Sequence, residues 1–316
     1  MTEKLEERYD VVVVGGGAAG LNGALMLARS RRSVVVVDSG SPRNAPAEAV
    51  HGLFARDGVP PAELLERGRA EVRSYGGQVV HGEVVGAERV EDGFAVTLAD
   101  GRAMRARRLL VTTGLVDELP DVAGLRERWG RDVLHCPYCH GWEVRDRAIG
   151  VLATGPMSVH QVLLFRQLSE DVVYFAHRTA LSAEDAAKLA ARGVRVVVGE
   201  VAGLELGDDW IRGVRLADDS VVPREVVAVA TRMVARDGFL AGLGLRAVDH
   251  PSGMGVHVPV DAAGRTDVPG VWAAGNVTDL SAQVGASAAA GAHAGAQINA
   301  DLVVEEAERA VARHPA

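Results

Sequence analysis

Cysteine is nearly absent from this chain, since only two occur in 316 residues. A network of structural disulfides is therefore excluded. Aromatic residues are also scarce, at 4%, which argues against a stacking surface for single-stranded nucleic acid. The net charge of −8 provides no basic surplus either. We therefore expect no nucleic-acid partner.

Long hydrophobic runs are absent as well. The runs reach about six residues, whereas a helix needs about 20 to span a bilayer. We expect no membrane association and, since no signal peptide precedes the first predicted strand, a cytoplasmic protein. The short runs are rich in Val and separated by many of the 37 glycines, which is typical of buried parallel strands with tight turns. A mass of 33.2 kDa suits an α/β protein of two domains.

A glycine-rich turn follows the first predicted strand, Tyr9–Val14. Gly15, Gly17 and Gly20 fit the pattern Gly-x-Gly-x-x-Gly at the start of an Ala- and Leu-rich helix. The first glycine permits a tight turn, the second lets the backbone approach a pyrophosphate, and the third lets helix and strand pack closely. Asp38 ends the next strand, where a ribose-binding carboxylate belongs. We therefore expect a dinucleotide-binding Rossmann unit.

Both cysteines lie in the segment His135-Cys136-Pro137-Tyr138-Cys139-His140-Gly141. A pair at this spacing can close a disulfide within one turn, and a neighbouring imidazole can hold or release the thiolate's proton. Pro137 suits the first position of a helix, whose dipole would lower the pKa of a cysteine. We interpret the segment as a redox dithiol of Cys136 and Cys139, with His140 as its acid or base.

Three alternatives for this segment remain. It could be half of a zinc site, but no second Cys-x-x-Cys or His-x₃-His follows, and we expect no metal. Cys-Pro-Tyr-Cys is also the tetrad of glutaredoxins, which carry it just after the first strand of a small domain, whereas 135 residues precede it here. A purely structural disulfide does not suit a cytoplasmic protein.

The remaining periodicity predicts the arrangement of the chain. Short strands at 78–81, 83–90, 94–98 and 108–112 suggest a β-meander inserted in the first unit. After the dithiol, strands at 148–153 and 171–176 flank a helix at 158–168, which forms a second βαβ unit. The C-terminal part predicts strands at 256–260 and 270–276 and two helices, 282–299 and 303–313, of which the second is a candidate dimer contact.

Together these pieces resemble the low-molecular-weight thioredoxin reductase family over almost the whole chain. The motifs that carry the resemblance are the glycine fingerprint, Thr112-Thr113-Gly114, the dithiol in the second unit, and Gly270–Asn276 followed by Gln283. The resemblance implies an α/β fold of two Rossmann-like nucleotide-binding domains and a homodimer. An FAD-binding domain with the inserted meander would comprise 1–116 and 247–316, and an NAD(P)-binding-like domain, 117–246, would carry the dithiol.

The resemblance also implies roles for single residues. Cys139 would lie beside the flavin, and Cys136 would exchange with substrate. The residues that it assigns to FAD are Gly15, Gly17, Ala18, Ala19 and Gly20 at the pyrophosphate, Asp38 at the adenosine ribose, Asn44 and His51 near the flavin, Val84 at the adenine, Thr113 and Gly114 at a strand end, and Gly275, Asn276, Gln283 and Val284 at the ribitol and isoalloxazine.

Departures from the family pattern bear on function. His140 replaces the aspartate that usually follows the second cysteine, and an imidazole can take a thiol proton as well as give one. In the second nucleotide loop, 150–158, only Gly155 of the three glycines remains, and Pro156 removes an N–H donor. Arg178 stands alone where the family usually has two arginines for the 2′-phosphate. These changes argue against tight NADPH binding.

Cys-Pro-Tyr-Cys-His-Gly with such a loop resembles the dithiol oxidases that close the disulfide of gliotoxin- and holomycin-type natural products. We therefore expect an FAD-dependent enzyme that oxidises a small-molecule dithiol and passes the electrons to oxygen. The alternative is a disulfide reductase, supplied by NADPH or another donor, that acts on a thioredoxin-like protein. A non-enzymatic FAD- or zinc-binding scaffold is a third hypothesis, and the presence of both cysteines argues against it.

Overall fold

The computed structural model describes residues 5–314 and divides them into two compact units. Unit 1 contains the chain up to Ala45, residues 59–116, and the chain from Met233 onward. Unit 2 contains residues 46–58 and 117–232. Compared with the sequence-based segments, the loop 46–58 lies with unit 2, and the return to unit 1 comes at 233 rather than 247. The early return follows from packing, because Phe239 and Leu240 are buried in a core of unit 1.

Unit 1 is built on a sheet of buried valines. Strands β1 (Arg8–Val14) and β2 (Val34–Asp38) are buried almost throughout, as parallel strands covered on both faces must be. In the described chain the seven-stranded sheet has the order β3-β2-β1-β6-β5-β4, with β19 beside β6. Its other strands are β3 (Gln78–His81), β4 (Val84–Val90), β5 (Gly93–Leu98), β6 (Ala103–Val111) and β19 (Val271–Ala273).

The inserted meander is shorter than the sequence suggested. Strands β4, β5 and β6 pair antiparallel, whereas β3 pairs parallel with β2 and belongs to the Rossmann layer. The error arose because β3 and β4 are separated by a two-residue connection, which usually joins antiparallel strands. Here Gly82 donates from its N–H to the carbonyl of Asp38 at 3.0 Å and turns the chain out of the layer.

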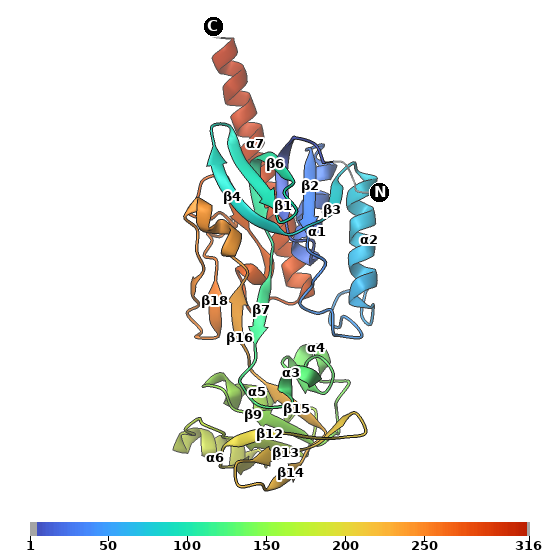
Figure 1. The fold of residues 1–316 in the computed structure, drawn as a ribbon, viewed down its shortest axis with the longest axis vertical. Helices are drawn as coiled ribbons and strands as arrows, with labels where there is room; N and C mark the ends of the chain where they lie inside the picture. The colour runs from blue at the N-terminus through green and yellow to red at the C-terminus, as the bar shows by residue number, and fades with distance from the viewer. Residues whose placement is uncertain (1–4, 315–316) are drawn as a thin grey trace. The chain divides into compact units, whose positions relative to one another are not determined.

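Helices α1 (Ala18–Arg29) and α7 (Val284–Arg313) lie side by side in unit 1 (Figure 1). A Cβ atom on Gly291 would lie 1.9 Å from the carbonyl oxygen of Ala19, so only glycine allows this approach. The prediction of two C-terminal helices was wrong, because α7 is continuous. Its polar stretch near Asp301 contains neither Gly nor Pro, and Leu302 is buried. Helix α2 (Pro61–Ser74) also packs against α1.

Unit 2 contains a second parallel sheet. Within the described residues its order is β11-β10-β9-β15-β8, and neighbouring strands pair in parallel. An antiparallel sheet, β12-β13-β14, accompanies it. The strands are β8 (Val133–Leu134), β9 (Ile149–Leu152), β10 (Val172–Phe175), β11 (Arg195–Val197), β12 (Val201–Gly207), β13 (Trp210–Leu216), β14 (Val221–Pro223) and β15 (Val226–Val229). The helices are α3 (Leu125–Arg128), α4 (Pro137–His140), α5 (Met157–Phe165) and α6 (Ala183–Ala191).

Four short strands form a further sheet, in the order β17-β18-β16-β7. The chain leaves unit 1 within β7 (Leu115–Glu118) and returns at β16 (Arg232–Ala235). The other two strands are β17 (Val248–Asp249) and β18 (Gly255–His257), and two 3₁₀ helices, η1 (Gly238–Leu243) and η2 (Gly275–Val277), complete unit 1. Across residues 5–314, the structure shows no helix long and apolar enough to cross a membrane.

Candidate flavin and dithiol sites

The glycine turn of unit 1 is shaped for a phosphate. Gly15 has φ = +105°, and a Cβ there would lie 2.4 Å from the carbonyl oxygen of Thr112. Gly17 caps α1 without a side-chain hydrogen bond, and a Cβ on it would meet nothing within 4 Å. The first turn of α1 holds no acidic residue. The backbone N–H groups of Ala18, Ala19 and Gly20 are therefore free to bind an anion, and the positive end of the helix dipole favours one there.

Most residues that the resemblance assigned to FAD gather at the carboxyl ends of the parallel strands of unit 1. A Cβ on Gly16 would lie 2.7 Å from Asp38, and one on Gly275 would lie 2.8 Å from the Cβ of Ala19. Thr113 donates from its hydroxyl to the Arg236 carbonyl at 2.7 Å. In open α/β sheets this edge is where nucleotides bind.

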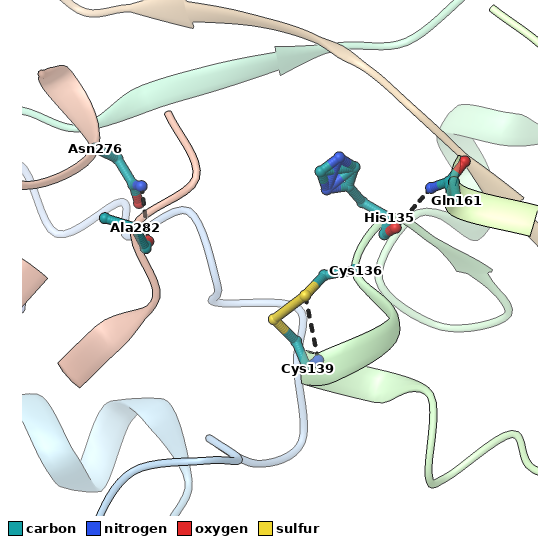
Figure 2. The surroundings of a disulfide bond; sticks show 6 residues. All are labelled: His135, Cys136, Cys139, Gln161, Asn276 and Ala282. Atoms are coloured by element: carbon teal, nitrogen blue, oxygen red, sulfur yellow. Dashed lines mark hydrogen bonds between the residues drawn. A yellow bond between two sulfur atoms is a disulfide. The ribbon is translucent and has the colours of Figure 1, made fainter. Parts of the chain in front are cut away.

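The start of α7 contributes the second group of residues that the resemblance assigned to FAD. Gln283 caps the helix without a side-chain hydrogen bond, and Val284 is its first residue. The Asn276 amide donates to the Ala282 carbonyl at 2.8 Å (Figure 2). It also donates to the Asp279 carbonyl at 3.0 Å, and the two bonds fix the turn before the helix. A second uncapped helix start thus belongs to the same unit as α1.

Three further residues of the FAD set lie at the ends of strands or beyond them. Gly114 has φ = +69° just after Thr113, and Val84 begins β4 two residues after Gly82. Asn44 lies in the turn that follows β2. One feature that the sequence analysis missed is Arg69, whose Nη2 lies 3.1 Å from the Oδ2 atom of Asp38. Taken together, the residues of unit 1 fit an FAD.

Cys136 and Cys139 form a disulfide at the start of α4, with their Cα atoms 5.3 Å apart (Figure 2). Cys136 is the N-cap residue, and its Sγ accepts the backbone N–H of Cys139 at 3.2 Å. Pro137 occupies the first helical position, as expected. Helix α5 supports the segment, because Gln161 donates from Nε2 to the His135 carbonyl at 2.7 Å. The N–H at Cys136 Sγ would stabilise a thiolate there once the disulfide opens.

His140 closes helix α4 and is well placed to be neutral. Burial is the main cause that lowers the pKa of its imidazole below the usual 6.5. The Glu143 carboxylate opposes this shift, and His51 adds to it. Its Nε2 atom is buried and has no hydrogen-bond partner among the described residues. A neutral imidazole with a free nitrogen can accept a proton.

His51, which the resemblance assigned to the flavin, lies on the loop 46–58 of unit 2. Its Nε2 is 3.4 Å from an oxygen of Glu143, and its Nδ1 is 3.5 Å from one of Asp57. The sequence analysis did not identify Glu143. Its position three residues after His140 was the available signal, since such spacing brings side chains together on helical turns.

The second nucleotide loop does not fit a pyrophosphate. Ser158 is fully buried, and its hydroxyl accepts the N–H groups of Thr154 at 3.0 Å and Gly155 at 3.4 Å. Those are donors that a Rossmann loop offers to phosphate. Arg178, the single arginine left for a 2′-phosphate, is paired with Glu200.

No group of three or more His, Cys, Asp or Glu side chains in the described part of the chain could hold a metal ion. The dithiol is therefore without the further ligands that a closed zinc site would need.

Comparison with known proteins defines the class. The family model described as "Pyridine nucleotide-disulphide oxidoreductase" matches residues 9–296, and the chain belongs to this family of flavin-dependent oxidoreductases. Thioredoxin reductase tcpT of Claviceps purpurea (strain 20.1) is 30% identical over 93% of this chain and 95% of that protein. The crystal structure of HlmI superposes with a TM-score of 0.90 at 50% identity and covers all of both chains. The oxidoreductase from Agrobacterium tumefaciens has a TM-score of 0.87 at 33% identity, covering 94% of this chain and 99% of its own.

These matches confirm the predicted thioredoxin reductase-like α/β fold and its enzymatic nature. They also confirm FAD as the cofactor. The protein is thus a disulfide oxidoreductase, and it carries the Cys136–Cys139 disulfide in unit 2.

Proposed function

We propose that this enzyme oxidises a small-molecule dithiol to its intramolecular disulfide, with oxygen as the final electron acceptor. The observation that carries the proposal is the second nucleotide loop, whose N–H donors are occupied by the buried hydroxyl of Ser158. An enzyme that cannot readily draw electrons from NADPH must receive them from another reductant. A dithiol substrate is that reductant. The resemblance of Cys136–Gly141 to the gliotoxin- and holomycin-type oxidases supports the same direction.

The chain's own residues supply the thiol chemistry. The Nε2 atom of His140 takes the proton of the first substrate thiol, and the thiolate attacks the Sγ of Cys136. The Cys136–Cys139 bond breaks, and Cys139 leaves as a thiolate with the bonding electron pair. The product of this step is a mixed disulfide between the substrate and Cys136.

The second substrate thiol completes the reaction. Its proton passes to the Cys139 thiolate, and its sulfur attacks the substrate sulfur of the mixed disulfide, so that Cys136 leaves as a thiolate beside the protonated His140. The N–H of Cys139, 3.2 Å from that sulfur, stabilises the new charge. The substrate is now a disulfide, and the enzyme holds two more electrons as a dithiol. An FAD held by the glycine turn of unit 1 would supply the chemistry that passes these two electrons to oxygen, with formation of hydrogen peroxide.

The test compares two reductants under anaerobic conditions. A small dithiol such as dithiothreitol should bleach the flavin absorbance readily, NADPH should bleach it slowly or not at all, and air should restore the colour with formation of hydrogen peroxide. Rapid bleaching by micromolar NADPH would overturn the proposal in favour of the reductase. A flavin that stays oxidised in the presence of the dithiol would also overturn it.

We also propose that the enzyme is a homodimer. Val303, Val304 and Val311 are exposed on the C-terminal part of α7, which supports an apolar contact there. Light scattering on the purified protein measures the mass directly, and a monomer at micromolar concentration would contradict the proposal.

A further inference from the structure

The loop 46–58 interrupts unit 1 in the sequence but belongs to unit 2 in space. Gly130 lies against Pro46, since a Cβ there would be 2.4 Å from the Cβ of Pro46. The loop closes on itself through Gly58, which donates from its N–H to the carbonyl of Val50 at 2.8 Å. His51 extends from this loop to Glu143, just beyond the dithiol helix. The side chain of His51 thereby contacts the segment that carries the cysteines, although the two are distant in the sequence.

His51 lies between two carboxylates. Asp57 faces its Nδ1 at 3.5 Å and is itself held by the N–H of Gly52 at 2.8 Å. Glu143 faces its Nε2 at 3.4 Å, and the two side chains are 24% and 40% exposed. An imidazole can donate to both carboxylates only when it carries two protons. His51, Asp57 and Glu143 thus form one polar cluster.

Glu143 also acts on His140. Glu143 lies three residues after His140, in the turn that follows α4, and this spacing can bring the two side chains together. The charged groups around His140 are therefore the dithiol, Glu143, and His51 with Asp57 from the loop. Helix α5, which packs against α4, carries one titratable side chain, the exposed His160. Of these groups, Glu143 is the one whose negative charge favours a proton on His140.

We propose that Glu143 is a positioning residue of the dithiol reaction: its carboxylate, shared with His51, stabilises the imidazolium that forms when His140 takes a thiol proton. Glu143 and His51 then set the basicity of His140 in opposite directions. This inference rests on the proposed function only in naming a substrate thiol as the proton donor. The electrostatic coupling of Glu143 and His51 to His140 does not depend on the proposed function.

The coupling is tested on the oxidised holoenzyme without substrate. Protein labelled with ¹⁵N-histidine is titrated by NMR, and the His140 signal is identified by its loss in His140→Gln. Glu143→Gln should lower the midpoint of the His140 titration, and His51→Gln should raise it. Glu170→Gln, which removes an exposed glutamate of the same unit, should leave it unchanged. Two shifts of opposite sign are not expected from a structural disturbance.

The kinetic consequence is measured separately. The acidic limb of the pH profile for anaerobic bleaching by dithiothreitol should move to lower pH in Glu143→Gln and to higher pH in His51→Gln, and Glu143→Asp should restore part of the first shift. If neither midpoint in the NMR titration moves beyond the Glu170→Gln control, the role of Glu143 is refuted. A wild-type enzyme that no dithiol bleaches refutes the proposed function instead and leaves the titration valid.

Discussion

At the scale of single residues, the dithiol segment concentrates the chemistry in a few neighbouring positions. Pro137 starts the helix, Cys136 caps it, and the N–H of Cys139 points at the capping sulfur. These relations follow from the local sequence, because a Cys-Pro start brings the cap and the third helical residue together. The dithiol geometry was therefore predictable.

Replacing either cysteine by serine should abolish dithiol oxidation, because both sulfurs are needed to take two electrons from the substrate. Oxygen consumption in the presence of dithiothreitol measures this loss. The wild-type chain offers a clean control: denatured without reduction it should show no free thiol, and after reduction it should show two. Turnover near the wild-type rate in either single variant would contradict a mechanism through the Cys136–Cys139 pair.

His140→Ala should slow anaerobic bleaching by about 10²–10⁴-fold while FAD stays bound, since this is the usual contribution of a positioned base. Because burial lowers the pKa of His140, its neutral form persists below pH 6.5, and the wild-type rate should be retained there. Stopped-flow absorbance across pH measures both effects. A variant with unchanged rates would move the role to His135 or His51.

At the scale of elements, the start of α1 should bind FAD through its backbone. Gly17→Ala should reduce FAD affinity by roughly tenfold or more, about 1.4 kcal/mol, because a methyl group would occupy the space that the pyrophosphate needs. The fold should tolerate the change, since that methyl meets no protein atom within 4 Å. Gly238→Ala is the matched control, because its Cβ also meets nothing. FAD affinity equal to that of the control would contradict the assignment.

The elements with strong periodicity were predictable from the sequence, and those defined by long-range contacts were not. Strand β3 matches its predicted range, 78–81, because its two central valines are buried between polar ends. Helix α6 was missed because only Leu189 of its nine residues is buried, so its apolar face is weak. The link between His51 and Glu143 joins residues some 90 positions apart, and nothing local to either residue predicts it.

At the scale of the whole molecule, ion pairs join the C-terminal part of α7 to other segments of unit 1. Glu306 accepts from Arg32 at 2.6 Å and from Arg107 at 2.7 Å, and these bonds lower the pKa of the carboxyl to about 2. A depressed carboxyl pKa stabilises the fold above the unfolded value of 4.5, and this stabilisation is lost as the pH falls toward 2. The C-terminal helix should therefore loosen in that window.

Glu306→Gln should flatten the dependence of stability on pH between 4.5 and 2, with a loss at neutral pH of less than about 1 kcal/mol, because solvent screens the 44% exposed carboxylate. Urea unfolding followed by circular dichroism at several pH values measures the change. Glu308→Gln, which alters an exposed residue two positions further on, is the control. Parallel curves for wild type and Glu306→Gln would show that the pairs contribute nothing.

The loop 46–58 and the C-terminal helix together impose an order on biosynthesis. Unit 1 starts before unit 2 in the sequence, yet its β19 and α7 follow unit 2, so unit 1 is incomplete until α7 has been synthesised. Unit 2 has all of its segments once Arg232 has emerged, and it begins with a loop that is made long before Glu143, which His51 of the loop contacts. Since domains fold as units during synthesis, the inserted unit is complete first. While unit 2 folds, the part of the Rossmann sheet that contains β1 and β6 therefore still lacks strand β19 in the nascent chain.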